Sequence, residues 1–335
     1  IFVGGGSDVD FEVGKLQAAF KCQDPVTLSP DQPLLFLGHD ISMSINDNNE
    51  RVLTIDQQRY IENAARRFEI VEEKSSRLMP DHFTTAWAAN ADDLNDDEQS
   101  ELRSIIGALS YATVSGVRAD GAATTGVLAE GQTKGTSRHR QAAKELLQYL
   151  FDTRKQRSIK VNLGEQVVYN LKEWKPQVVT AFDASYGIKS RSGYIIYVDG
   201  IPVRCKSKGQ TQISLSTTEA ELIAGTLAAK ETMGLVNLMS EVFGIEQKDF
   251  SITLKGDNVA ANLIASNSAG LRKVRHLCVG DLYIRRLTLD GRVKVEYVNT
   301  LNNPSDMLTK PYGHQKLNAL WDVFLNFGNQ KHGGA

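Results

Sequence analysis

The sequence predicts a mixed α/β fold, in which a five-stranded sheet covered by helices follows a mainly helical region. From about residue 165 the chain consists of short runs of β-branched and aromatic residues, which are typical of strands. The pair Asp199-Gly200 separates two such runs and is a strong hairpin signal. The predicted order after residue 165 is β-β-β-α-β-α-α-β-α, so three antiparallel strands lead into alternating helices and strands of one mixed sheet.

In the first half we expect a strand at "IFVGG", a helix around "VDFEVGKLQAAF" and a strand at "PLLFLGHDISM". A clear amphipathic helix follows at "LTIDQQRYIENAARRFE", with a predicted N-cap at Thr54. Three further helices are predicted at "DDEQSELRSIIGALSYATVS", "GAATTGVLAEG" and "SRHRQAAKELLQYLFDTR".

In the second half the first three strands are predicted at "QVVTAFDAS", "RSGYIIYVDG" and "IPVRCKSK". The segment "QTQISL" is interpreted as a strand that continues into a helix running from Ser216 to about Val242. The remaining elements are predicted in this order: strand "SITLKGDN", helix "VAANLIAS", helix "VGDLYIRRLTLDG", strand "RVKVEYVNT" and a last helical region from "NPSDMLTKPY".

Composition places the chain among ordinary globular proteins. Its 335 residues are 41% hydrophobic and 23% charged, a length that suggests two or three domains. We expect boundaries near residues 50 and 165. No apolar run approaches 18 residues, so no transmembrane span is expected. The cysteines suit an intracellular, reducing compartment rather than a disulfide framework, because they are few and far apart: Cys22, Cys205 and Cys278.

The charge is unevenly distributed. Residues 1–170 carry 18 Lys and Arg against 25 Asp and Glu, whereas residues 171–335 carry 20 against 15. Basic segments such as "KGTSRHRQAAK", "RCKSKGQ" and "LRKVRH" are compatible with a polyanionic partner and do not require one.

The stretch "STTEAEL" places two carboxylates at the start of the long helix. Ser216 and Glu219 fit a capping box, in which Glu219 returns to the amide of the N-cap residue. Glu221 has no such capping role, and a lone glutamate on a helix is ordinarily exposed to solvent. It shares its helical face with small residues, which favours close packing of that face against a sheet: Ala224, Gly225 and Ala228.

Three further acids are predicted to converge on Glu221. Asp183 lies on the first strand of the sheet, Asp257 ends the fourth strand, and Asp306 opens the final helix. Taken singly, Asp257 reads as a turn residue and Asp306 as an N-cap. Together the four follow the order of acids in the ribonuclease H (RNase H) fold. Such a cluster is what two Mg²⁺ ions about 4 Å apart require, with Mn²⁺ as a substitute, and without metal the carboxylates would repel one another.

The sequence around these acids resembles the C-terminal part of the Pol polyprotein of copia-type LTR retrotransposons. The resemblance rests on the run from "DASYG" to "STTEAEL" and on "RKVRHLCVGDLYIRR" and "VNTLNNPSDMLTKPY". It implies that residues 166–335 form an RNase H domain whose metal-binding acids are Asp183, Glu221, Asp257 and Asp306.

Upstream segments resemble the reverse transcriptase of the same family. "FLGHDISM" is similar to the end of its palm, and "LRSIIGALSYATVSGVRAD" and "AAKELLQYL" to its thumb and connection. The resemblance implies a residual end of the palm at 1–50 and a thumb/connection region at 51–165. The Tyr-x-Asp-Asp polymerase motif is absent from the sequence, so we expect no polymerisation by this chain alone.

The function implied by the resemblance is a two-metal endonuclease that hydrolyses the RNA strand of RNA–DNA hybrids. The expected partners are the hybrid and either the missing fingers and palm or other protein chains of a larger assembly. Basic and polar residues near the acids are expected to contact the duplex through phosphates and the minor groove: Lys206, Lys208, Arg272, Lys273 and Arg275, together with Ser185, Gln212, Ser214 and Asn258.

The chain departs from the family pattern at several positions. The family usually has Asp and Trp at Ser185 and Tyr186, Trp at Cys205, a basic residue at Gly209, Pro at Ala119 and His at Leu282. These differences concern substrate contacts more than the metal site. His276 matches a family histidine and reads either as a structural or as an accessory residue. Some related enzymes have a histidine before the last acid that assists product release. No histidine lies in the 20 residues before Asp306, so the resemblance implies slow turnover.

The sequence allows two other interpretations. A domesticated retroelement fragment could serve as a structural subunit of a larger complex, and it would then bury a large apolar surface on residues 1–165 against partner chains. An integrase or exonuclease fits poorly, because those enzymes order their acids differently or need His or Tyr beside the last Asp.

Overall fold

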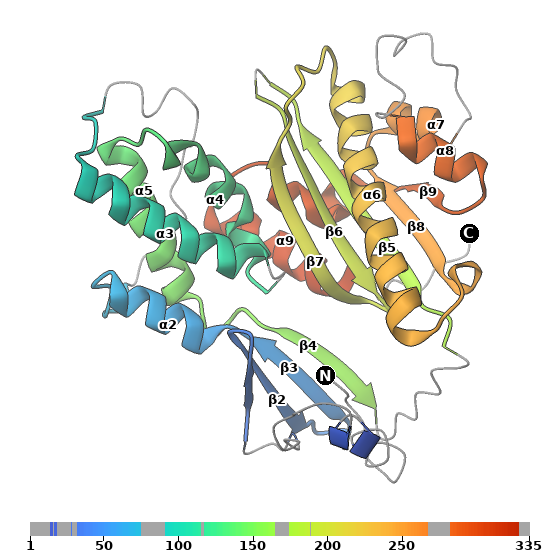
Figure 1. Cartoon of the computed structure of the whole chain (residues 1–335), viewed down its shortest axis with the longest axis horizontal. Helices are drawn as coiled ribbons and strands as arrows, with labels where there is room; N and C mark the ends of the chain where they lie inside the picture. Colours follow the sequence, from blue (N-terminus) through green and yellow to red (C-terminus); the bar gives the residue numbers. More distant parts are fainter. Residues whose placement is uncertain are drawn as a thin grey trace.

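The computed structural model of the protein describes residues 14–15, 17–18, 28, 32–74, 91–114, 117–164, 174–187, 189–266 and 282–327. The strand predicted at "IFVGG" and most of the helix predicted around residues 9–20 lie outside these ranges. Within them, two sheets and a group of helices form the molecule (Figure 1).

The larger sheet has five strands in the order β7-β6-β5-β8-β9. β5 pairs antiparallel with β6 and β6 with β7, while β8 runs parallel to β5 and β9 parallel to β8. This is the mixed sheet of the RNase H-like fold, so the predicted fold class and element order are confirmed. The bounds are β5 Gln177–Ser185, β6 Arg191–Val198, β7 Ile201–Gly209, β8 Ser251–Gly256 and β9 Lys294–Tyr297.

Helices cover both faces of this sheet (Figure 1). α6 (Thr217–Phe243), α7 (Val259–Ala265) and α8 (Tyr283–Leu289) pack with one face in a common core. α9 (His314–Asn326) packs on the other face. No helix in the described part of the chain is both long enough and apolar enough to cross a membrane.

Turn chemistry sets the ends of these elements. Asp199 and Gly200 both have positive φ angles, 47° and 83°, as the predicted hairpin requires. Gly244, at φ 67°, ends α6 with a left-handed residue.

Two local predictions in this half are wrong. Residues 210–215 form a loop rather than a strand, because Gln210 turns inward and its side chain hydrogen bonds to Ser192 and Ser214. Asp306 lies in a separate 3₁₀ helix, η7 (Pro304–Leu308), and does not open the final helix. α9 begins only at His314, because the intervening Pro311 has no amide hydrogen with which to continue a helix.

The first half contains the predicted helices and an unpredicted sheet. The helices are α2 Gln58–Arg67, α3 Asp96–Val114, α4 Ala122–Leu128 and α5 Ser137–Asp152. The sheet has four antiparallel strands in chain order: β1 Leu34–Phe36, β2 His39–Ile45, β3 Arg51–Asp56 and β4 Ile159–Gly164. It therefore joins strands from both sides of the boundary predicted at residue 50, and the predicted domain limits stay predictions.

Two details of this sheet differ from expectation. The single strand predicted at "PLLFLGHDISM" is a hairpin, which turns at Leu37 and Gly38 with positive φ angles of 47° and 69°. Thr54 lies in β3 and does not cap α2. The amides at the start of α2 are bound instead by carboxylates, because Asp56 accepts from the Gln58 amide at 2.9 Å and Asp40 from the Arg59 amide at 3.1 Å.

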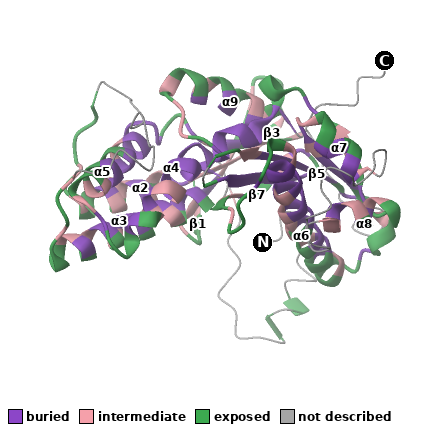
Figure 2. Cartoon of the chain, turned by 90° about the horizontal axis from the view of Figure 1, so that it is seen from above, coloured by how far each residue is buried: buried purple, intermediate pink, exposed green. Residues whose placement is uncertain are grey.

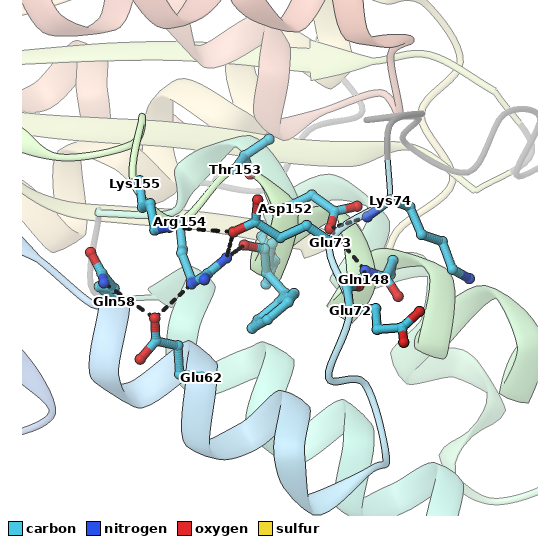
Figure 3. A network of polar contacts seen from close by, with 12 residues as sticks. Gln58, Glu62, Glu72, Glu73, Lys74, Gln148, Asp152, Thr153, Arg154 and Lys155 are labelled. Carbon is cyan, nitrogen blue, oxygen red and sulfur yellow. Dashed lines mark hydrogen bonds and ion pairs between the residues drawn. The ribbon is translucent and has the colours of Figure 1, made fainter.

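An ion-pair network ties α2 to the end of α5 (Figure 3). The guanidinium of Arg154 donates to Glu62 on α2 at 2.7 Å and pairs with Glu73 at 2.9 Å. It also lies 4.0 Å from the centre of the Phe151 ring. The network thus joins α2 to the residues that follow α5.

The helical region and the five-stranded sheet share a core. One buried cluster runs from Leu102 and Leu146 in the helices to Ile195 in the sheet and Phe324 on α9. A second cluster fills the space between the sheet and α6. In Figure 2 the buried residues accordingly pass through β5 and the side of α6 that meets it. The sheet that carries the predicted acids is thus supported on both faces.

Candidate metal centre

Three of the predicted acids lie together at one end of the sheet. Asp183 lies on β5, Glu221 in the second turn of α6, and Asp257 directly after β8. One carboxylate oxygen from each lies within 4.8 Å of the other two. Asp183 is 4% and Glu221 6% exposed, so Glu221 is not the solvated glutamate that a lone residue on a helix would be.

Strand pairing explains why these acids meet. β5 and β8 are parallel neighbours, with Ala181 opposite Lys255. Asp183 and Asp257 therefore lie at the same end of the sheet, where both strands have their carboxyl ends. Small residues on α6 bring Glu221 to that edge, as predicted: Ala224, Gly225 and Ala228 are all buried.

Two glycines allow the close packing of the site. Gly193 pairs with Asp183 across the sheet, and a Cβ atom there would lie 2.7 Å from the Cβ of Leu308 in η7. Gly256 precedes Asp257, and a Cβ atom there would lie 2.5 Å from the Phe182 ring. A larger residue at Gly193 would push η7 away from β6, and one at Gly256 would push β8 away from the Phe182 ring on β5.

The capping prediction for α6 is correct for Ser216 and differs for Glu219. The Ser216 hydroxyl accepts a hydrogen bond from the Glu219 amide at 3.2 Å. The Glu219 carboxylate, however, accepts from the Leu215 amide at 2.7 Å, one residue before the predicted N-cap amide. Glu219 is therefore occupied in the loop and leaves Glu221 as the acid of this helix in the site.

The fourth acid, Asp306, is buried beside the cluster but is held by other groups. Its carboxylate accepts from the Tyr312 hydroxyl at 2.8 Å, and the ammonium groups of Lys310 and Lys316 lie at 3.3 and 3.0 Å. The Thr309 hydroxyl donates to the Asp183 carboxylate and lies 3.1 Å from the Asp306 carbonyl oxygen. Thr309 thus links the first acid to the segment that carries the fourth.

Burial and mutual repulsion raise the pKa values of two acids in the cluster. Burial, with added repulsion from Asp257 and Asp306, raises the pKa of Asp183 to about 6 even though the Thr309 hydrogen bond opposes it. Burial and the charges of Asp183 and Asp257 raise the pKa of Glu221 to about 10. Glu221 therefore retains its proton at neutral pH unless positive charge is supplied, whereas Asp183 is mainly protonated only below about pH 6.

The donor set fits a divalent metal ion. Carboxylate oxygens are the ligands that Mg²⁺ and Mn²⁺ prefer. The Glu221 Oε1 atom accepts from the Ala184 amide at 3.2 Å, whereas its Oε2 atom is buried without a hydrogen-bond partner. An orphaned carboxylate oxygen among other carboxylates is the polar group that a cation would satisfy.

The predicted nucleic-acid contacts are placed differently from one another. Lys206 and Lys208 lie on the edge strand β7, and Gln212 is exposed in the loop after it. Three side chains are occupied by local hydrogen bonds: Ser185 accepts from the Arg191 amide, Asn258 from the Ala261 amide, and Ser214 is 4% exposed and donates to Gln210. Arg272, Lys273, Arg275 and His276 lie outside the described residues.

Several residues around the acids were missed from the sequence. Asn303 is fully buried, and its amide donates to the Phe182 carbonyl, next to Asp183, at 3.0 Å. Its side-chain oxygen accepts from the Ser305 amide, next to Asp306, at 3.2 Å. Asn303, Thr309 and Tyr312 all lie within the quoted "NPSDMLTKPY" stretch, which was the available signal; Lys316 lies beyond it.

Comparison with known proteins places the chain among retroelement proteins. It is 29% identical over 304 residues to the retrovirus-related Pol polyprotein from transposon TNT 1-94 of Nicotiana tabacum, an alignment that covers 89% of this chain. The chain is similar to the retrovirus-related Pol polyproteins of transposons. It spans only 14 to 21% of the length of three such curated relatives. No family model matches the sequence.

The solved structures found to be similar have low sequence identity and low TM-scores. The N-terminal RNase H domain of rv2228c from Mycobacterium tuberculosis is 14% identical, with 44% of this chain and 96% of that chain covered and a TM-score of 0.31. A foamy viral protease-reverse transcriptase in complex with double-stranded DNA is 13% identical, with 80% and 38% covered and a TM-score of 0.42. The strand order and the Pol relatives together identify an RNase H-type retroelement domain.

Proposed function

We propose that the chain is a metal-dependent endonuclease that hydrolyses the RNA strand of RNA–DNA hybrids. The observation that carries the proposal is the convergence of Asp183, Glu221 and Asp257, with oxygens within 4.8 Å of one another, on an RNase H-type sheet. Buried like charges are costly to a fold, and a cation site is the function that gives them a use.

The proposed roles follow from the positions of the side chains. Asp183, Glu221 and Asp257 would hold Mg²⁺ or Mn²⁺, and Asp306 is the fourth acid of the family pattern. A bound divalent ion supplies Lewis-acid chemistry, which activates water and stabilises the leaving oxygen. Thr309 orients Asp183, and the Ala184 amide fixes one oxygen of Glu221 so that the other faces the cluster.

The proposed substrate contacts are electrostatic. Lys206 lies on the outermost strand of the sheet with Lys208 two residues further, on the same side of the strand. They would contact phosphates in a salt-dependent manner without reading sequence. The proposed protein partner is the remainder of the polymerase or another chain of a larger assembly.

The test is cleavage of an end-labelled RNA–DNA hybrid with Mg²⁺, in which the unaltered chain is compared with Asp257→Asn. Asp249→Asn is a matched control, because Asp249 lies in the 3₁₀ helix Gln247–Asp249 and is not one of the clustered acids. We expect nicks in the RNA strand only, a loss of about 100-fold or more in Asp257→Asn, and normal cleavage by Asp249→Asn.

Double-stranded DNA and double-stranded RNA serve as substrate controls, and EDTA as the metal control. A folded, unaltered chain that leaves the hybrid intact would refute the nuclease proposal and would favour the structural-subunit alternative.

A further inference from the structure

The carboxylate of Asp306 is already neutralised by the protein's own groups. Oδ1 accepts from the Tyr312 hydroxyl at 2.8 Å and lies 3.3 Å from the Lys310 ammonium. Oδ2 lies 3.0 Å from the Lys316 ammonium. The Asp306 side chain is only 4% exposed, whereas the side chains of Lys310 and Lys316 are 47% and 50% exposed. Among the described residues, the acids whose carboxylate oxygens lie within 4.8 Å of one another are Asp183, Glu221 and Asp257, and Asp306 is not one of them.

The two lysines reach Asp306 from different elements. Lys310 follows η7 and is four residues along the chain from Asp306. Lys316 belongs to the first turn of α9, and its ammonium lies 3.6 Å from the centre of the Tyr312 ring. A cation over an aromatic face is further stabilised, so Tyr312 holds both the carboxylate and its partner.

α9 is itself firmly anchored, which fixes where Lys316 is presented. The Tyr197 hydroxyl on β6 donates to the Phe324 carbonyl at 3.1 Å. The Arg157 guanidinium lies 4.7 Å from the centre of the Trp321 ring and donates to the side chain of Asn318. The ammonium that pairs with Asp306 is therefore delivered by a helix packed into the core rather than by a loop.

We propose that Lys316, assisted by Lys310, competes with a divalent cation for the Asp306 carboxylate. The two metal ions of the centre therefore bind with unequal affinities. This inference rests on the proposed metal site. One ion binds through Asp183, Glu221 and Asp257. A second ion that engages Asp306 must displace the Lys316 ammonium, and it binds more weakly for that reason.

The physical basis is charge competition at one carboxylate. An ammonium at 3.0 Å compensates Asp306 before any ion arrives, and it repels an incoming dication at the same place. Because the Lys316 side chain is 50% exposed, solvent screens the pair and the effect is moderate. Removal of the ammonium should tighten the weaker ion about threefold to tenfold.

The test is titration of the full chain with Mn²⁺ in the absence of nucleic acid. Binding is measured by calorimetry and by electron paramagnetic resonance of free Mn²⁺. The variants are Lys316→Gln, which removes the charge, and Lys316→Arg, which keeps it. Lys294→Gln is the matched control, because Lys294 also pairs with a carboxylate, that of Glu296 at 2.6 Å, but lies at the opposite end of β9 from the site.

We expect one tight and one weaker Mn²⁺ in the unaltered chain. Lys316→Gln should tighten only the weaker ion, whereas Lys316→Arg and Lys294→Gln should leave both affinities unchanged. Two ions of equal affinity in the unaltered chain, or a weaker ion unaffected by Lys316→Gln, would overturn the proposal. Failure of the proposed function is seen separately, as a folded, unaltered chain that leaves the hybrid intact or as hybrid cleavage that Asp257→Asn does not reduce.

Discussion

Two buried aspartates, Asp120 in the helical region and Asp183 in the sheet, show opposite treatments of the same charge. Both are almost inaccessible, at 2% and 4% exposure. Asp120 receives both arms of the Arg118 guanidinium at 3.0 and 2.9 Å and the Tyr149 hydroxyl at 2.9 Å. Asp183 receives one hydroxyl, and its charged neighbours include two further acids.

The consequences appear in the acidity of the two groups. Burial alone would raise the pKa of Asp120, but the charges of Arg118 and Arg157 outweigh it, so the pKa lies below its ordinary value. Burial raises the pKa of Asp183 to about 6. The fold thus supplies a guanidinium to the buried Asp120 carboxylate. Asp183 forms no ion pair among the described residues, and the charge of Lys310 does not offset its burial, so the difference between the two aspartates marks the candidate metal centre.

The largest expected effect comes from removing the internal cation in the helical region. Arg118→Met keeps much of the side-chain volume but leaves the Asp120 carboxylate without its closest partner. We expect a loss of about 3–5 kcal/mol in the free energy of unfolding, measured by urea denaturation at pH 7. The double variant Arg118→Met/Asp120→Asn should recover part of that loss. A loss below about 1 kcal/mol would show that Asp120 does not depend on Arg118.

The converse change at the metal centre should stabilise the protein when metal is absent. The pKa of Asp183 is 3.8 in the unfolded chain and about 6 in the folded one. Between these values the folded protein holds a proton that the unfolded chain has released, so its stability falls as pH rises from about 4 to about 6. Glu221, with a pKa raised to about 10, extends this fall to higher pH. Asp120 acts in the opposite direction, because its contribution is lost as pH drops below 3.8.

Asp183→Asn should therefore unfold at higher urea than the unaltered chain in EDTA. The gain should grow from near zero at pH 4 to about 2 kcal/mol at pH 7. Mg²⁺ should reverse the ranking at pH 7, because it stabilises only a chain that binds it. If the variant is less stable than the unaltered chain at pH 7 in EDTA, Asp183 is compensated in a way that its surroundings do not show.

A smaller effect is expected at the residue that joins the first and fourth acids. Asn303→Ala removes the hydrogen bond to the Phe182 carbonyl and leaves that carbonyl and the Ser305 amide without their partner. The expected loss of stability is about 1–3 kcal/mol by urea denaturation. The matched control is Asn302→Ala, which should leave the stability nearly unchanged because Asn302 is exposed. Equal stability of the two variants would remove Asn303 from the support of the site.

The strands and helices of the sheet could be predicted because local signals agreed with the global fold there. Runs of β-branched and aromatic residues, the Asp199-Gly200 turn and the Ser216 cap all act within a few residues. The convergence of Asp183, Glu221 and Asp257 could also be predicted, because the order of the acids along the chain matches that of the RNase H fold.

What could not be predicted depends on long-range pairing. β4 joins β3 across about 100 residues, and neither strand carries a turn signal that names its partner. The Arg118 to Asp120 pair is local, but its burial under Tyr149 is not visible in the sequence. The lysines at Asp306 were missed because a basic residue near an acid is usually a solvated one.

The smallest effect tests whether burial, rather than pairing itself, distinguishes the two aspartates. Lys134 pairs with Asp93 at 3.3 Å, but their side chains are 80% and 67% exposed. Water already solvates both charges, so Lys134→Gln should change the free energy of unfolding by less than about 0.5 kcal/mol at any pH from 5 to 8. A change as large as that of Arg118→Met would mean that ion pairing stabilises this fold wherever it occurs. The raised pKa of Asp183 would then be a sign of missing partners in general, and would no longer single out a site reserved for a cation.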